Sequence, residues 1–388
     1  MSTRRWLIVL ALFGVVHNAL RAVAALLGAP WGFFNYLPLA RYKAPGVPEI
    51  LMLAGVLIVV GGAILVAAGI WRKPDKPSPM LSSAVWAVAA GAGTGLFAVY
   101  ANTIGSFTYG WTLFVVTPFL MGFISTLALA YRAPVALPDA FGVSILSVAL
   151  LGGLLLALAV EGVVCMVMAL PIAVLLAMTG AAIAYLSQRK LAARSPMMFL
   201  VLLGTTPFSA TLEHALQPPA ELFSVTTSID IPAPPDRVWR TVLQPAKLAP
   251  PSHPLLRSGI AYPLASHIEG VGLNATRYCD FSTGKLVEPV LIWREGRQLR
   301  FTVVSNPLPM QEWTPYAQIH PPHLEGFLAS RQGEFRIEPL ANGGTRLFAT
   351  TWYQHHMWPA VYWRVWSDYI IHRVHDMVLE NVRQRALS

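Results

Sequence analysis

The composition of the chain is that of a protein lying partly in a membrane. Its 388 residues are 55% hydrophobic and only 12% charged, and the mean hydropathy is +0.53. Soluble globular chains carry about 25% charged residues, so the composition excludes a wholly soluble protein. The net charge of +9 does not indicate nucleic-acid binding, because many basic residues lie in short loops between apolar segments, where they orient a protein in the bilayer.

The charged residues divide the chain into two halves. Residues 1–221 hold 12 Lys and Arg and 6 Asp and Glu, whereas residues 222–388 hold 16 and 13. The second half is long enough to bury its own core. The two cysteines, Cys165 and Cys279, lie in different halves, so no disulfide framework is predicted. We therefore expect a membrane domain over 1–212, a linker over 213–222 and a globular domain over 223–388.

The first half contains a series of segments long and apolar enough to cross a bilayer. They are Trp6–Leu27, Pro48–Trp71, Leu81–Ile104, Trp111–Tyr131, Phe141–Val160 and Val163–Leu186. A shorter apolar stretch follows at Ser195–Leu212. The sequence thus predicts a polytopic α-helical membrane domain of six or seven transmembrane helices, inserted in the cell membrane.

The basic residues in the loops predict an orientation. One side of the predicted membrane domain collects Arg4, Arg5, Arg72, Lys73, Lys76, Arg132, Arg189, Lys190 and Arg194. The short loops of the other side hold only Arg41 and Lys43. By the positive-inside rule the N-terminus is cytoplasmic. If Ser195–Leu212 spans the membrane, the C-terminal domain is extracytoplasmic, which is the arrangement we expect; if it lies along the interface, the domain is cytoplasmic.

The second half has the pattern of an α+β domain with an antiparallel sheet. Phe223–Ile231 alternates as a half-buried strand does, and a short helix is predicted at Arg237–Val242. Further strands are predicted, separated by Gly-containing turns: Ala265–Glu269, Gly272–Phe281, Lys285–Arg294, Arg297–Ser305, Ser330–Pro339 and Thr345–Tyr353. No strand–helix–strand alternation is present, which excludes a parallel sheet.

A long helix that begins at Pro359 closes the chain, because no Gly or Pro interrupts the sequence after it. On a helical wheel one face is apolar; it consists of Trp363, Trp366, Ile370, Val374, Met377 and Val378. The opposite face carries Asp368, His372, His375 and Asp376. We expect the apolar face to pack on the sheet and the Asp/His face to point outward, towards solvent or a docking surface.

The motifs of this half resemble those of a known superfamily. They are SIDIPAPPDRVWRTV at 228–242, GVGLNATRYCDFSTGK at 270–285, VLIWREGRQLRFTVV at 290–304 and GEFRIEPLANGGTRLFATTWY at 333–353, followed by the long helix. Together they are similar to the START-like helix-grip superfamily (SRPBCC), which includes polyketide cyclases/dehydrases and lipid-transfer proteins. The resemblance covers about residues 222–386. It implies a sheet curved around the terminal helix, with a cavity for an apolar small molecule, and it transfers no catalytic residue.

Histidines form the most conspicuous candidate chemistry in this half. His320 and His323 flank two prolines, and His355 and His356 follow the last predicted strand. One interpretation is a metal site for zinc or a similar ion, formed by His320, His323 and one of His355 and His356, with Glu325 as a further candidate ligand. Another is general acid–base catalysis by any of the four, because imidazole titrates near neutral pH. The third is that these side chains pack and hydrogen-bond in ordered loops.

Counting by twos along the strands predicts the lining of the cavity. If Cys279, Phe281, Val290, Ile292, Phe301, Val303, Phe335 and Ile337 face it, then Arg277, Glu288 and Arg331 share that side, and Thr351 and Tyr353 join them. These five polar residues are the predicted ligand-binding set. A buried Arg–Glu group either holds the polar end of a ligand or closes on itself. Cys279 is predicted to be a buried, inert thiol.

These features predict a membrane-anchored domain that binds a lipid or another apolar small molecule as a carrier or sensor, next to the membrane lipids that supply it. The alternatives are a cyclase/dehydrase-like enzyme acting on an apolar substrate and a structural module that docks through Asp368, His372 and His375. Whether the domain catalyses a reaction stays open. No cofactor, no nucleic-acid partner and no particular protein partner is expected.

Overall fold

The computed structural model describes residues 40–41, 79–100, 102, 109–131, 134–158, 160–187, 196–216, 220–314, 316, 318–319 and 321–388. The chain forms two compact units. The first contains the chain up to Gln217 together with Glu312–Pro322, and the second contains Pro218–Gln311 and His323–Ser388. The expected spans Trp6–Leu27 and Pro48–Trp71 lie outside the described residues.

The first unit is helical. Its elements are α3 (Pro79–Tyr100), the π-helical turn η2 (Thr112–Val116), α4 (Thr117–Leu129), α5 (Leu137–Ala157), α6 (Val163–Ser187) and α7 (Pro196–Ala215). A small antiparallel pair joins β1 (Ala40–Arg41) to β8 (Gln318–Ile319). Among the described residues, three helical stretches are long and apolar enough to cross a membrane: Thr112–Leu129, Leu137–Ala157 and Val163–Ser187. α7, which covers the predicted seventh span, is not one of them.

Helices α4 and α6 approach each other closely at two glycines. A Cβ on Gly122 would lie 1.8 Å from the carbonyl oxygen of Ala177, and a Cβ on Gly180 would lie 2.0 Å from that of Phe119. Neither clash can be relieved by a side-chain rotation, because both partners are backbone atoms. Small residues at a helix crossing are the usual means of close packing where lipid surrounds the helices.

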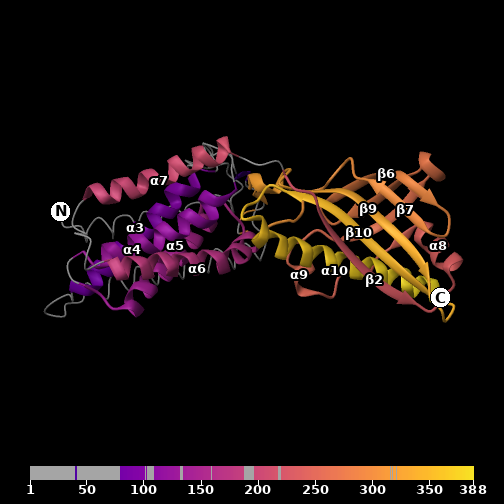
Figure 1. Cartoon of the computed structure of the whole chain (residues 1–388), viewed down its shortest axis with the longest axis horizontal. Coiled ribbons are helices and arrows are strands. Elements are labelled where there is room, and N and C mark those ends of the chain that lie inside the picture. The colour runs from indigo at the N-terminus through magenta and orange to yellow at the C-terminus, as the bar shows by residue number, and fades with distance from the viewer. Residues whose placement is uncertain are drawn as a thin grey trace, which may run out of the picture. The chain divides into compact units, whose positions relative to one another are not determined.

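The second unit is an antiparallel sheet that curls beside a long C-terminal helix, α10 (Ala360–Leu387) (Figure 1). The strands run in the order β2-β10-β9-β7-β6-β5-β4-β3. Their bounds are β2 (Phe223–Ile231), β3 (Ala246–Lys247), β4 (Pro263–Glu269), β5 (Thr276–Phe281), β6 (Gly284–Arg294), β7 (Gln298–Thr302), β9 (Leu328–Pro339) and β10 (Thr345–His355). The short helices are α8 (Pro235–Leu243), α9 (Pro254–Arg257) and the turns η3 (Gly272–Asn274) and η4 (Pro322–Leu324).

Two β-bulges shift which residues face inward. In β6, Val290 pairs with Phe301 of β7, but the next pair is Ile292 with Arg300, so Leu291 is the extra residue. The next inward residue after Val290 is therefore Trp293, which pairs with Leu299, and not Ile292. In β9 the pairing with β10 passes from Gln332 to Ser330, which leaves Arg331 as the extra residue. A bulge breaks the alternation of a strand and increases its twist. The predictions that Ile292 and Arg331 face inward with their neighbours are therefore wrong.

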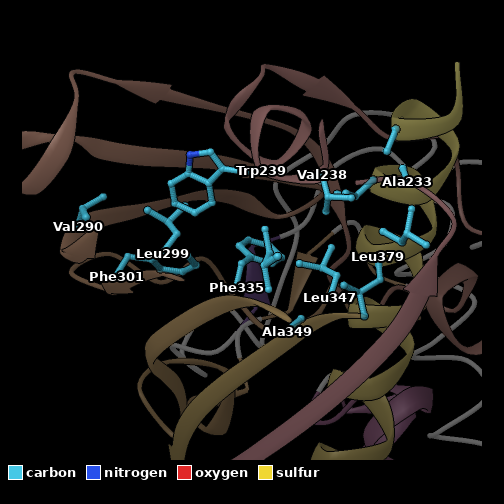
Figure 2. Close-up of a cluster of buried hydrophobic side chains, with 14 of the residues drawn as sticks. Ala233, Val238, Trp239, Val290, Leu299, Phe301, Phe335, Leu347, Ala349 and Leu379 are labelled. Atoms are coloured by element: carbon cyan, nitrogen blue, oxygen red, sulfur yellow. The ribbon is translucent and has the colours of Figure 1, made fainter. Parts of the chain in front are cut away.

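The core of the second unit lies between the sheet, α8 and the C-terminal half of α10. Figure 2 shows this cluster, in which Val238, Leu299 and Leu347 are fully buried and Leu379 reaches in from α10. Trp239 of α8 meets Trp293 edge to face, with the ring centres 5.7 Å apart. Each fully buried Leu or Val contributes about 1.5–3 kcal/mol relative to an exposed one, so this end of the unit holds the helix on the sheet.

Candidate functional site

Beside the middle of α10 the packing opens into a cavity of about 180 Å³ between the sheet and the helix. Its walls are mostly apolar. The apolar side chains that line it include Cys279, Phe281, Leu286, Phe301, Val303, Phe335, Ile370, Val374 and Val378. Three residues that were predicted to face the cavity, Arg277, Glu288 and Thr351, also border this space. So does His375, which was predicted to point away from the sheet. The cavity is thus an apolar chamber with a few polar groups, which is the usual form of a small-molecule site.

Arg277 and Glu288 form a buried ion pair in the wall of the cavity. They lie directly opposite each other on β5 and β6, and their side chains are 9% and 4% exposed. Nη1 of Arg277 donates to Oε2 of Glu288. The guanidinium also lies 5.1 Å from the ring centre of Phe301 and 5.6 Å from that of Phe335. The sequence therefore identified both members, and the structure shows that they close on each other.

The charges of this pair cancel within the cavity wall. Burial raises the pKa of Glu288, and the adjacent guanidinium acts in the opposite direction. Burial acts to lower the pKa of Arg277, but the Glu288 carboxylate outweighs it and the pKa is raised. Arginine keeps its proton in proteins. A pair that lost one member would leave an uncompensated buried charge, which is strongly destabilising.

A second polar group runs from α10 to the sheet through His375. Its Nε2 lies 2.8 Å from Oγ1 of Thr351, and its Nδ1 lies 3.0 Å from Oγ1 of Thr227. The Thr227 hydroxyl also lies 2.7 Å from Nδ1 of His372. Burial, together with the nearby His372, lowers the pKa of His375 to about 4. The imidazole is therefore neutral at physiological pH, with one nitrogen donating and the other accepting.

The expectation that His375 points away from the sheet is wrong. The buried face of α10 consists of Trp363, Ser367, His375, Leu379, Val382 and Ala386. This face is rotated about the helix axis from the face that the helical wheel predicted from apolar residues alone. Ile370, Val374 and Val378 line the cavity as expected, and Asp376 is exposed. Asp368 accepts a hydrogen bond from the Tyr353 hydroxyl at 2.5 Å, and His372 bonds to Thr227 of β2. Three members of the predicted outward face therefore bond to the sheet.

The other predicted ligand-binding residues are divided by the structure. Thr351 borders the cavity. Tyr353 is fully buried but packs with Phe223 and Val225 and does not line the cavity. Arg331, the bulge residue, is exposed and donates from Nε to Oε1 of Gln354 at 2.8 Å. Only three of the five, Arg277, Glu288 and Thr351, thus meet at one site.

Of the four candidate catalytic histidines, the three that the structure describes do not line the cavity. His320 lies outside the described residues. His323 is buried within η4, and His355 is buried in a stack on Phe223, with ring centres 5.2 Å apart. Burial lowers the pKa of His355. His356 is exposed. Since none of the described members lines the cavity, the acid–base and metal interpretations of this set stay predictions.

Sequence reasoning missed His375 as a site residue, although a signal for it was present. Thr227 and Thr351 lie at inward positions of their strands, where neighbouring inward residues such as Val225 and Ala349 are apolar. A polar pair at such positions predicts a polar partner on the covering helix. Cys279 is buried, and burial raises the pKa of its thiol to about 11. The prediction that this thiol is buried is confirmed.

Comparisons with known proteins add little beyond the geometry. No protein-family model and no curated protein matches the chain. Among solved structures, the protein XoxI from Bacillus cereus is 14% identical over 42% of this chain and 96% of its own, with a TM-score of 0.28. Norcoclaurine synthase from Thalictrum flavum, in complex with dopamine and hydroxybenzaldehyde, is 9% identical over 43% and 88%, with a TM-score of 0.28.

The geometry itself defines the class of the second unit. A curled antiparallel sheet with a long C-terminal helix against it, and a cavity between the two, is a helix-grip domain. The prediction of an α+β helix-grip domain over the C-terminal half is confirmed. Fold alone does not determine function, so the cavity and its polar groups carry the functional argument.

Proposed function

We propose that the C-terminal unit binds an apolar small molecule in the cavity between the sheet and α10, and that the N-terminal helices hold this unit at a membrane. The observation that carries the proposal is the apolar chamber of about 180 Å³ bordered by Arg277, Glu288, Thr351 and His375. A well-packed core leaves few voids larger than a water molecule, so a chamber of this size is a feature that a ligand would fill.

The volume sets the size of the molecule. Sites for drug-sized ligands are roughly 300–1,000 Å³, whereas an apolar cavity of about 150 Å³ holds a benzene molecule. The chamber of about 180 Å³ therefore suits a ligand about the size of one ring, or one short arm of a lipid. A larger lipid would require α10 to move away from the sheet.

The first unit supports attachment to a membrane. Several large apolar side chains of α6 are exposed, including Leu175 at 65% and Leu186 at 72%. Such exposure would be costly in water and is ordinary for helices surrounded by lipid. We infer six or seven spans, a cytoplasmic N-terminus and an extracytoplasmic C-terminal unit. A reporter fused after Ser388 tests the side: activity of a periplasmic or extracellular reporter supports it, and activity of a cytoplasmic one overturns it.

The sequence motifs and the helix-grip fold together support membership of the START-like superfamily. Within it, geometry favours binding over acid–base catalysis by the candidate histidines, because His323, His355 and His356 do not line the chamber. A molecule that dissolves in the bilayer would be met at its source by a pocket tethered there. The carrier and sensor roles share this binding step.

Native mass spectrometry of the purified full chain tests the proposal. Val374 borders the chamber, and Val374→Phe should fill part of it. Val365, on the same helix, is 67% exposed, so Val365→Phe is the matched control. We expect a co-purifying small molecule in the wild type and in Val365→Phe and its loss in Val374→Phe. No bound molecule in any preparation, or equal retention in Val374→Phe, would overturn the proposal.

A further inference from the structure

We propose that the chamber selects an uncharged molecule carrying one hydroxyl or carbonyl group, and that the Thr351 hydroxyl, oriented by His375, holds this group. The inference rests on the proposed binding function and specifies the chemistry of its ligand. It follows from the pairing of the charges in the chamber wall and from the hydrogen bonds that His375 makes to Thr227 and Thr351.

The charged side chains around the chamber are paired or turned away. Arg277 and Glu288 bond to each other. Glu334 also borders the space, but it follows the inward Gly333 and precedes the inward Phe335, so by strand alternation its side chain belongs to the outer face of β9. There it accepts from Nε2 of Gln298 at 2.8 Å. No unpaired charge among the described lining residues is thus available to a charged ligand.

The hydrogen bonds of His375 leave one open position, at Thr351. A neutral imidazole has one N–H and one accepting nitrogen, and both nitrogens face threonine hydroxyls. When Nε2 carries the proton, it donates to Thr351, and the Thr351 hydroxyl proton is left to donate. When Nδ1 carries it, Thr351 donates to Nε2, and both lone pairs of the Thr351 hydroxyl are left to accept. Among the described residues, Thr351 Oγ1 has no second hydrogen-bond partner.

The two tautomers of His375 allow the Thr351 hydroxyl either to donate or to accept a further hydrogen bond. Thr227 bonds to both His375 and His372, so its hydroxyl can reverse direction when His375 changes tautomer. The chain then offers a donor to a carbonyl oxygen or an acceptor to a hydroxyl. Both are uncharged groups, and neither would leave a buried polar atom unsatisfied. An anion or a cation would enter a mostly apolar chamber without an unpaired counter-charge, which is costly.

Four one-ring probes test this selection on the full chain in lipid nanodiscs, with free concentrations corrected against empty nanodiscs. They are phenol, cyclohexanone, toluene and benzoate, which supply a hydroxyl, a carbonyl, neither and a carboxylate. Thr351→Val removes the hydroxyl at nearly constant shape. Thr226→Val makes the same change one residue from Thr227 on the exposed face of β2 and is the matched control.

We expect Thr351→Val to weaken phenol and cyclohexanone about fivefold, the usual effect of one hydrogen bond, and to change toluene less than twofold. Thr226→Val should change none of them. Benzoate should bind at least about a hundredfold more weakly than phenol. Benzoate binding as tightly as phenol, or an equal loss of toluene and phenol in Thr351→Val, would overturn the selection and leave the binding function standing. Binding of none of the probes would overturn both.

Discussion

Nε2 of His375 lies 2.8 Å from Oγ1 of Thr351, so the C-terminal helix presents a buried histidine to the last strand at the edge of the chamber. The contact joins the element that closes the cavity to the sheet that forms its floor. Because both side chains also border the cavity, a change in protonation of His375 acts on stability and on the site together.

Acid should destabilise the second unit through His375. Its pKa is about 4 in the folded chain and about 6.5 when unfolded, so between these values the unfolded chain binds more protons. The free energy of unfolding therefore falls as pH falls, by about 2 kcal/mol from pH 7 to pH 5, and the contribution is constant above about pH 7. Hydrogen-exchange protection of β10 and α10 peptides, corrected for intrinsic rates, measures it.

Two variants separate this effect from general acid sensitivity. His375→Gln should flatten the dependence, because the amide does not titrate and keeps a donor and an acceptor. His356→Gln changes an exposed histidine and should leave the wild-type dependence intact. A His375→Gln protein that loses protection between pH 7 and pH 5 as steeply as the wild type would contradict the assignment.

The Arg277–Glu288 pair should behave as a unit in mutagenesis. Glu288→Gln or Arg277→Met alone leaves one buried charge without its partner and should cost roughly 3–5 kcal/mol. The double variant Arg277→Met, Glu288→Leu should recover most of that loss, because apolar residues of similar volume often replace a buried pair at little cost. Exchange protection of β5 and β6 in the three variants gives the coupling. Additive losses in the double variant would show that the two side chains act independently.

Gly333 should resist enlargement because of Phe301. A Cβ at this position would lie 2.3 Å from Cε2 of the Phe301 ring, which itself faces the Arg277 guanidinium. Gly333→Ala should therefore cost about 1–3 kcal/mol through overpacking, and it should weaken toluene binding by pushing the ring into the chamber. Gly333→Ala combined with Phe301→Leu should restore protection. A single variant with wild-type protection and binding would refute the contact.

Glu312 should stabilise the first turn of α6. Its carboxylate accepts from the backbone N–H groups of Val164 at 3.0 Å and Cys165 at 3.1 Å, which otherwise lack helical partners. Glu312→Ala should cost about 1–2 kcal/mol and raise exchange at the start of α6, whereas Glu312→Gln should retain part of the cap. Exchange at the C-terminal end of α6 is the internal control and should not change. Unchanged exchange at Val164 in Glu312→Ala would contradict the capping role.

Much of the C-terminal fold was predictable because its signals are local. The alternation of Phe223–Ile231 gave the bounds of β2, and the Gly-containing turns separated most of the later strands near their observed ends. Pro359 marked the start of α10, because proline is compatible with the first positions of a helix and not with its interior. These features depend on residues a few positions apart, which a sequence displays directly.

The errors arose where distant contacts decide the outcome. A one-residue bulge in β9 moved Arg331 outward, and another in β6 moved Trp293 inward; strand alternation cannot reveal either of them. His375 is buried because Thr227 and Thr351 meet both its nitrogens, whereas a helical wheel counts it as polar. Glu312–Pro322 belongs to the first unit although it lies far beyond the predicted boundary at 213–222, because Glu312 caps a helix there.

The central claim is that a small molecule occupies the chamber between the sheet and α10, and intermolecular NOEs test it most directly. The full chain would carry labelled valine methyl groups and be saturated with phenol. We predict NOEs from the phenol ring to Val303, Val374 and Val378, which line the chamber, and none to Val361 or Val365, which are 82% and 67% exposed. NOEs to Val361 or Val365 without any to the chamber valines would contradict the claim.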